Sequence, residues 1–531
     1  MKLKKIIATF CLALTVLVLT SCSGIHLNNI PSTNDTVYGN GGVSVTKGDY
    51  IYFVNSYTSY NGLQKGDNDT GKVTVGAIYR TKLENGQIKT DNNNNVQDCE
   101  LVVSKIAGYE FTNLHIFDDY IYYATPNMDY AKDGSLNTVA VDFCRTKLDG
   151  TDTQIIYTAK NYTASSSYEV YKIGTSIYLV VFENDKLVKV EISNHIKSAV
   201  TLVENVTAVQ LPKINTYTYS DNVAITGTQG YAYYTRDFSK NQDGAYDTDA
   251  ISGNVLGRVL ITDGSKTERK DVNVKYELKD LTNNYIFVVK GVDIYAIDSS
   301  FPLSAIERGK ADVRLTNSSS SLSVSNFYAT KNSNGFIYTL NGASYYVENI
   351  KSQKTYIIHP SSEIVAKSDD GNYAYYENGT TIERVPLKPV YYNVSEFTLN
   401  ANTTLAGTSY TAGSEIPAFT FITQSEYFAI SNSVDKNKFT IQNSGETIAD
   451  DSNMSSDYID YTKQGEIFFF CKYTGANDDS QYYLKRIVLS SEAKIKTTDD
   501  NEEVVTPSTW EEWNLGYTQE LVCPLDSKHK S

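Results

Sequence analysis

Short runs of tyrosine and aliphatic residues recur along the chain, and glycine, aspartate or asparagine opens each run. The two clearest copies read GDYIYF at 48–53 and DDYIYY at 118–123. Runs of this length are long enough for a β-strand and too short for a helix. The polar residues before them supply the tight reversal that precedes a strand. The pattern therefore predicts strands that are entered through turns.

Each clear copy is followed by a second run that ends in a turn, IYRTKLENG at 78–86 and FCRTKLDG at 143–150. A third run (154–157) and a β-rich run ahead of the phrase (111–117) complete four antiparallel strands per unit. Weaker copies begin near residues 176, 230, 284, 335, 371, 426 and 465. Starts roughly 40–70 residues apart are typical of propellers and solenoids.

The repeated unit predicts an all-β protein, a β-propeller of four-stranded antiparallel blades. A lone sheet of this size cannot bury both faces, whereas sheets stacked around an axis can. Of nine second-strand candidates, the one at Tyr427 has no Arg-x-x-Leu after it, and the irregular stretch 388–425 indicates an insertion within a blade. We predict eight blades, with seven as the alternative.

The ends of the chain differ from the repeat. We assign residues 1–21 to a lipoprotein signal peptide, 22–39 to a polar tether, 40–505 to the propeller and 506–531 to a C-terminal segment that holds both tryptophans, Trp510 and Trp513. That segment is either a closing strand or a cap on the last blade, and we expect it to close the ring.

The first residues are typical of an export signal. Lys2, Lys4 and Lys5 precede an apolar run over 6–20, which is too short for a stable membrane span. The run ends LTSC at 19–22, which resembles the bacterial lipobox. This resemblance implies lipid on Cys22 and an extracytoplasmic protein held to the cell membrane by that lipid alone. The alternative is an ordinary signal peptide with a chance cysteine.

The repeat itself resembles the YWTD β-propeller of low-density-lipoprotein-receptor-related proteins, in a bacterial lipoprotein version. The shared pattern is Tyr-(Ile/Trp)-Tyr-x followed by (Ile/Phe)-x-Arg-x-x-Leu-Asp-Gly, and it covers about residues 40–505. The resemblance implies that Arg80 and Arg145 lie on third strands as structural residues bonded to backbone or acidic groups. The structural repeat positions are Arg80, Leu83, Gly86, Arg145, Leu148, Asp149 and Gly150.

Composition and charge favour β-strands and limit the classes of partner that the protein can bind. The 43 tyrosines against 2 tryptophans favour strands. The net charge of −15 becomes −18 once Lys2, Lys4 and Lys5 leave with the signal peptide. Nucleic acid and anionic lipid both require a basic face, so we expect neither as the main partner.

Export permits disulfides, and four cysteines remain besides Cys11 and Cys22. They are Cys99, Cys144, Cys471 and Cys523, which allow three pairings. None forms a Cys-x-x-Cys or a metal-ligand spacing. Cys144 stands where Tyr79 stands in the earlier repeat, which indicates a packing residue, and we favour buried free thiols.

Long second-to-third strand loops are predicted at 55–76, 125–139, 235–253 and 472–480. In a propeller these loops emerge on one face, and their Asn, Asp, Gly, Ser and Tyr residues are typical of adaptable recognition surfaces. We therefore expect them to bind a protein or glycan at the cell envelope. The alternative interpretation is that these loops are solvated insertions without a binding role. A further interpretation is that the propeller is a docking platform beside a membrane complex.

One loop carries a candidate calcium site at Asn241, Asp243, Asp247 and Asp249. The Asn241-x-Asp243-Gly segment matches the middle of a calcium loop, but Ser239 and Ala250 occupy its two end positions. Apart from this Ca²⁺ we expect no cofactor.

The sequence contains no catalytic signature such as a Gly-x-Ser-x-Gly elbow, a His-Glu-x-x-His motif, a Walker loop or a dinucleotide fingerprint. The five histidines show no ligand spacing, and Asp pairs such as 118–119, 369–370 and 478–479 fit turns. We predict a non-catalytic protein, with a propeller glycan hydrolase or lyase using channel-face carboxylates as the alternative.

Overall fold

Every regular element in the described part of the chain is a β-strand in this computed structural model. The structure describes residues 25–55, 69–70, 73–74, 76–90, 92, 96–97, 99–107, 113–127, 140–163, 165–217, 230–237, 254–270, 275–301, 312–316, 324–330, 335–340, 343–351, 355–359, 366–367, 373–378, 381–387, 390–393, 404–405, 408–409, 420–422, 427–432, 438–443, 446–450, 454–460, 466–474, 480–495 and 513–521. The predicted all-β class is confirmed.

The described strands form antiparallel units of four strands in chain order, which we number as sheets 1 to 8. In sheet 1 three further strands extend this unit to seven. From first to fourth strand, sheet 1 contains β2 (Ser44–Lys47), β3 (Tyr50–Val54), β6 (Ile78–Glu84) and β8 (Glu100–Val103), and sheet 2 contains β9 (His115–Phe117), β10 (Tyr120–Pro126), β11 (Val141–Lys147) and β12 (Gln154–Ala159). Sheet 3 contains β13 (Ser167–Ile173), β14 (Ser176–Glu183), β15 (Lys186–Ile192) and β16 (Val200–Val203). Sheet 4 contains β17 (Val206–Gln210), β19 (Tyr231–Asp237), β20 (Asn254–Leu260) and β21 (Lys266–Lys270).

Sheets 5 to 8 repeat the order. Sheet 5 contains β22 (Tyr276–Leu281), β23 (Tyr285–Lys290), β24 (Asp293–Asp298) and β25 (Asp312–Arg314), and sheet 6 contains β26 (Val324–Thr330), β27 (Gly335–Leu340), β28 (Ala343–Val347) and β29 (Thr355–His359). Sheet 7 contains β30 (Ala366–Lys367), β31 (Tyr373–Asn378), β32 (Thr381–Pro386) and β39 (Glu446–Asp450). Sheet 8 contains β40 (Met454–Asp460), β41 (Glu466–Thr474), β42 (Ser480–Ile495) and β43 (Trp513–Leu521). Short hairpin strands accompany sheet 1: β4 (Asp69–Thr70), β5 (Val73–Thr74) and β7 (Gln87–Ile88).

Sheet 7 contains an insertion between its third and fourth strands. β32 pairs with β39, and the chain between them forms a further four-stranded sheet. That sheet contains β36 (Thr420–Ile422), β37 (Tyr427–Asn432), β38 (Lys438–Asn443) and β33 (Val390–Asn393), beside the hairpin β34 (Thr404–Leu405) and β35 (Thr408–Ser409). The insertion is longer than the expected 388–425, and Tyr427 lies inside it rather than in a blade of its own.

The sheets stack face to face, so each central strand is apolar on both sides. In β3, Tyr52 packs with residues of sheet 2, whereas Ile51 packs with Phe468 of sheet 8. In β23, Val288 packs toward sheet 4 and Phe287 toward sheet 6. Burial on both faces explains why the repeated phrase is continuously apolar instead of alternating with polar residues.

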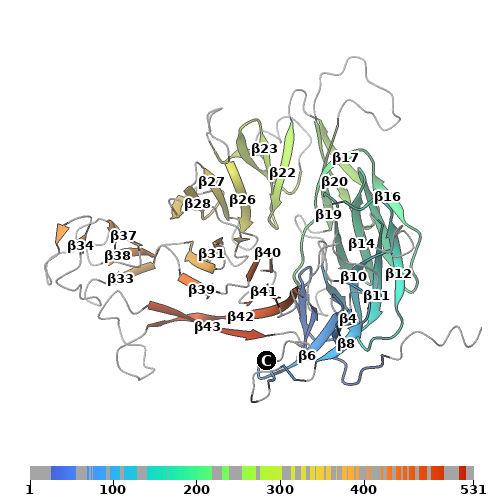
Figure 1. Cartoon of the computed structure of the whole chain (residues 1–531). Coiled ribbons are helices and arrows are strands. Elements are labelled where there is room, and N and C mark those ends of the chain that lie inside the picture. Colours follow the sequence, from blue (N-terminus) through green and yellow to red (C-terminus); the bar gives the residue numbers. More distant parts are fainter. Residues whose placement is uncertain are drawn as a thin grey trace, which may run out of the picture.

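The stack returns to its beginning. First strands of successive sheets contact one another, as in β2–β9, β17–β22, β22–β26 and β26–β30, which is the arrangement of a propeller. Sheet 8 lies against sheet 1, where Arg486 Nη1 donates to Gly86 O at 3.1 Å. Figure 1 shows the same circuit, with the red β42 beside the blue β6. The number of blades stays a prediction.

The segment expected to be a polar tether is docked on the propeller from residue 25. Its strand β1 (Val37–Tyr38) lies between β2 and β18 (Thr216–Tyr217), which connects β17 to β19. Val37 is 1% exposed, so it belongs to the core. The polar composition of 22–39 concealed this docking because backbone groups and a few apolar side chains produce it.

Truncation of the chain after residue 505 removes β43. The long strand β42 then becomes an exposed edge with unpaired backbone groups. We expect the unfolding midpoint to fall by several degrees in thermal denaturation. A chain truncated after residue 521 is the control and should keep the full midpoint, and equal midpoints for the two truncations would show that β43 contributes nothing.

Candidate functional site

The antiparallel order gives each sheet two different ends. The second-to-third strand connections lie at one end, which we call the loop face. The first-to-second and third-to-fourth turns lie at the other, which we call the turn face. All four predicted long loops therefore arise on the loop face. Most of their residues lie outside the described ranges, as do Cys22 and the candidate calcium residues Asn241, Asp243, Asp247 and Asp249.

The roots of two of these loops are held by backbone hydrogen bonds. Asn55 N donates to Ala77 O at 2.8 Å, and Gly76 N donates to Asn55 O at 2.6 Å. Asn127 N donates to Ala140 O at 2.9 Å in sheet 2. Each loop thus leaves and re-enters the propeller at a fixed point.

A buried carboxylate reinforces the second root. Asp142 Oδ1 accepts hydrogen bonds from Asn127 Nδ2 at 2.8 Å and from Thr158 Oγ1 at 2.6 Å. Asp142 is 6% exposed. Asn127 directly follows the second strand, and Asp142 and Thr158 lie on the third and fourth strands, so the network fixes the strand ends from which the 125–139 loop arises.

The repeat arginines occupy the same place in three sheets. Arg80, Arg145 and Arg258 lie on third strands, each with its guanidinium 4.5 Å from the centre of a second-strand tyrosine ring. Their partners differ. Arg80 pairs with Glu100 at 2.7 Å and donates to the carbonyls of residues 28 and 29, whereas Arg145 donates to the amide oxygen of Gln154 at 2.9 Å.

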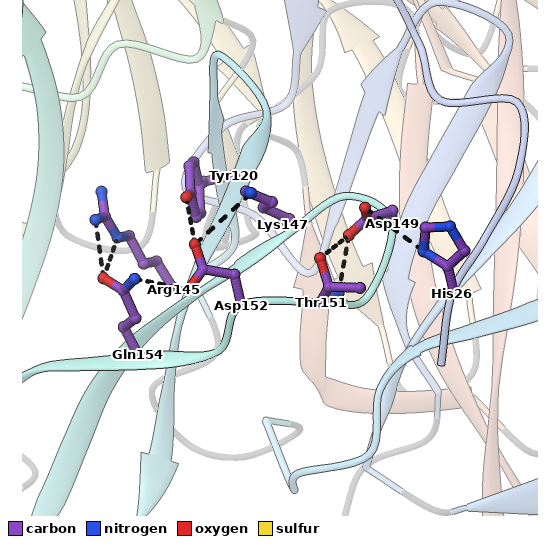
Figure 2. A network of polar contacts seen from close by, with 8 residues as sticks. All are labelled: His26, Tyr120, Arg145, Lys147, Asp149, Thr151, Asp152 and Gln154. Carbon is purple, nitrogen blue, oxygen red and sulfur yellow. Dashed lines mark hydrogen bonds and ion pairs between the residues drawn. The ribbon is translucent and has the colours of Figure 1, made fainter. Parts of the chain in front are cut away.

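Figure 2 shows the network around Arg145. Gln154 Nε2 donates to Asp152 Oδ1 at 2.8 Å, and Tyr120 Oη donates to Asp152 Oδ2 at 2.7 Å. Burial and this bond to the carboxylate raise the pKa of Tyr120 to about 12. The bonds from Tyr120 and Gln154 lower the pKa of Asp152 in return. These side chains satisfy one another, which indicates a structural role.

The Leu-Asp-Gly positions form the turns that end third strands. Leu148 is buried and donates from N to Asp119 O at 2.8 Å, and Leu83 donates to Asp49 O at 2.6 Å. Asp149 Oδ1 accepts from Thr151 N and Thr151 Oγ1 at 2.8 and 2.6 Å. Gly86 and Gly150 take φ values of 81° and 84°, a left-handed conformation that favours glycine.

A buried histidine–glutamate pair lies on the first strands of sheets 2 and 3. His115 Nε2 lies 2.9 Å from Glu169 Oε2, and the side chains are 2% and 5% exposed. The rings of Phe117 and Tyr168 lie 6.4 and 6.2 Å from the imidazole. Sequence inspection missed this pair because 54 residues separate the two side chains in different sheets.

Residues 39–42 cover the pair. A Cβ at Gly41 would lie 3.6 Å from His115 Nε2, and Gly41 N donates to Leu114 O at 2.8 Å. The Asn40 side chain exchanges two hydrogen bonds with the backbone of Ile116, at 2.8 and 3.3 Å. The centre of the first sheets is therefore filled, and the pair is reached only if this segment moves.

A second group of charges lies at the turn-face end of the same strands. Lys172 pairs with the Asp118 carboxylate, and Lys47 donates to the Asp118 carbonyl. The Lys172 ammonium also lies 5.3 Å from the ring centre of Tyr217 in β18. This group ties sheets 1, 2 and 3 and the strand β18 together.

The remaining candidate chemistry is sparse within the described ranges. There, no three His, Cys, Asp or Glu residues gather as a metal site would require. His195 is exposed, and His26 Nδ1 lies 3.9 Å from Asp149. Cys144 is a buried thiol and Cys99 is a half-buried one, and they do not form a disulfide with each other. In the same residues, no helix is long and apolar enough to cross a membrane.

No protein-family model and no curated protein matches the chain. Similar solved structures include prolyl endopeptidases, with 8% identity over 87% of this chain and 56% of that chain at a TM-score of 0.38. The YWTD-type propeller of a nidogen/laminin complex matches with 11% identity over 60% of this chain and 94% of that one, at 0.25.

Hsv2 of Kluyveromyces lactis matches with 10% identity over 70% of this chain and 92% of that chain, at a TM-score of 0.32. The chain spans about half the length of the prolyl endopeptidases it matches. At these TM-scores the likenesses carry no argument about function, and the propeller assignment rests on the sheets themselves.

Substitution of Glu169 by Leu should destabilise the protein. It leaves the buried His115 ring without its hydrogen-bond partner, which typically costs about 1–3 kcal/mol. Glu169→Gln keeps a polar group at the same place and should cost less. Chemical denaturation of Glu169→Leu, His115→Phe and the double variant completes the cycle, and we expect the double variant to recover part of the loss. Additive losses would show that the two side chains do not depend on each other.

Cys144 should resist alkylation in the folded protein. Burial raises the pKa of its thiol to about 12, so at pH 8 about one thiol in ten thousand is the reactive thiolate. Iodoacetamide treatment followed by peptide mapping should leave Cys144 unmodified in buffer and modify it in denaturant. Equal modification in both conditions would contradict the buried thiol.

Proposed function

We propose that this chain is a lipid-anchored extracytoplasmic β-propeller that binds a protein or glycan partner of the cell envelope through its loop face. The lipobox-like LTSC sequence at 19–22 supports lipid on Cys22. Binding is non-catalytic and needs no resident cofactor, apart from a calcium ion at Asn241, Asp243, Asp247 and Asp249 if that loop holds one.

The fixed loop roots carry the proposal. Backbone bonds at Asn55–Ala77 and Asn127–Ala140, with the Asp142 network, hold loop ends of two neighbouring sheets at the same end of the propeller. A rigid scaffold that presents several polar, tyrosine-rich loops side by side is a common arrangement for recognition, because little order has to be gained on binding.

The alternative, a glycan hydrolase or lyase, requires a pair of accessible carboxylates, one with a raised pKa. Glu169 at the centre is buried against His115 under residues 39–42. Asp149, Asp152, Glu191 and Asp263 all have lowered pKa values. These observations favour binding over acid catalysis.

Replacement of residues 56–68 and 128–139 by short Gly/Ser linkers should abolish partner binding. The probes are purified cell-wall fragments and detergent extracts of the envelope, with retention measured by co-sedimentation and by cross-linking. We expect retention to fall by at least about tenfold, as loss of several contacts would produce.

The control is the variant Glu84→Ser with Lys89→Ser, which changes an exposed ion pair on the turn face. It should bind as the unaltered chain does. Equal retention of the loop variant and the control would overturn the assignment of binding to the loop face.

A further inference from the structure

The segment 25–36 crosses the turn face of sheets 1 and 2. It begins on the turn that ends β11, where a Cβ at Gly150 would lie 2.3 Å from the Ile25 side chain. Leu27 N donates to Asp149 O at 2.9 Å, and the exposed His26 lies beside the same aspartate, as Figure 2 shows. The first described residues of the chain are therefore seated on a third-to-fourth strand turn.

The next residues are held by sheet 1. Arg80, 0% exposed, donates to Asn28 O at 2.5 Å and to Asn29 O at 3.4 Å. A buried guanidinium that loses these acceptors is costly, because a charged donor is left unpaired away from water. Arg80, the repeat arginine of sheet 1, thus fixes the backbone of the segment at Asn28 and Asn29.

The end of the segment lies on two first-to-second strand turns. Thr33 Oγ1 donates to Asp119 Oδ1 at 3.0 Å. A Cβ at Gly48 would lie 2.7 Å from Asp35 Oδ2, so the segment packs closely on that turn as well. Residues 25–27, Thr33 and Asp35 therefore contact turns of the turn face, whereas residues 28 and 29 are bonded to Arg80 within β6.

The segment cannot slide or lift at its far end. Directly after it, β1 pairs with β2 and β18, and Val37 is buried. Both ends of the segment are therefore fixed, which distinguishes it from a flexible linker of similar polar composition.

Covalent reach then limits the distance from the propeller to the lipid. Three residue steps separate Cys22 from Ile25, and an extended chain spans at most about 3.6 Å per residue, or about 11 Å in all. A lipid on Cys22 is consequently held close to the turn that ends β11.

We propose that the docked segment 25–36 orients the propeller, with its turn face toward the lipid headgroups and its loop face away from the membrane. This inference rests on the lipidation of Cys22 in the proposed function. It deepens that function by naming the side of approach. The loop face meets a partner on the far side of the propeller, a wall glycan or a protein that is not embedded in the same membrane.

Strand length sets the separation of the two faces. β14 runs eight residues from the turn face to the loop face, a length of about 26 Å at 3.3 Å per residue. Thr175 precedes β14 and Lys186 follows it, and both are exposed. These two positions therefore report opposite faces of one sheet.

The experiment is energy transfer from a dye on the full-length lipidated chain to acceptor-labelled lipid headgroups in vesicles of phosphatidylcholine. Dyes are placed by Thr175→Cys or Lys186→Cys, with Cys99, Cys471 and Cys523 changed to serine. We expect transfer from position 175 to exceed transfer from position 186 at least about twofold, given their separation. Equal transfer, or more transfer from 186, would overturn the orientation.

Two controls separate the causes. A 20-residue Gly/Ser insertion after residue 22 allows about 25 Å of additional reach and should remove the difference between the dyes. A difference that survives the insertion would overturn the role of the docked segment. The Cys22→Ala variant should be absent from the membrane fraction. If the chain that retains Cys22 is absent from that fraction as well, the proposed lipidation is wrong, and this result is distinct from a failure of the orientation.

Discussion

The requirement that each sheet bury both of its faces determines the rest of this structure. A four-stranded sheet with Ile51 on one side and Tyr52 on the other has no solvent-facing surface in its central strands. Only neighbouring sheets can cover both sides, so the sheets continue until the last meets the first. The contact of Phe468 with sheet 1 and the bond from Arg486 to Gly86 join the two ends of that series.

Burial on both faces creates a second requirement, because the tyrosines and arginines of the repeat carry polar atoms into the interior. Hydrogen bonds answer it for the arginines, since Arg80 donates to Glu100 and to two backbone carbonyls and Arg145 donates to Gln154. Each guanidinium also stacks on a second-strand tyrosine ring, a cation–π contact worth about 0.5–2 kcal/mol. Volume is balanced across strands as well. Tyr123 faces Cys144, and Tyr234 faces Gly257, where an added Cβ would lie 2.3 Å from the tyrosine ring.

The repeat also determines which features of the fold could be predicted from the sequence. The phrase around Tyr50 and Tyr120 predicted strands and turns because these depend on local pattern, and the resemblance to the YWTD repeat implied that Arg80 and Arg145 lie on third strands. The insertion in sheet 7 was underestimated because its strands have the same composition as the blades around them. The His115–Glu169 pair and the docking of residues 25–36 depend on which sheets become neighbours, and no local pattern records that.

In the proposed membrane-anchored arrangement, the docked segment matters for partner binding because of the charge on the chain. Without its signal peptide the chain has a net charge of −18 and is repelled by an anionic surface within a Debye length of about 8 Å, so on a long tether it would stand off from the membrane and turn freely. A segment fixed at Gly150, Arg80 and Gly48 opposes that rotation through contacts whose geometry does not depend on salt. A loop face that is held outward loses less orientational freedom when it meets its partner, and this gain requires no additional contact with the partner.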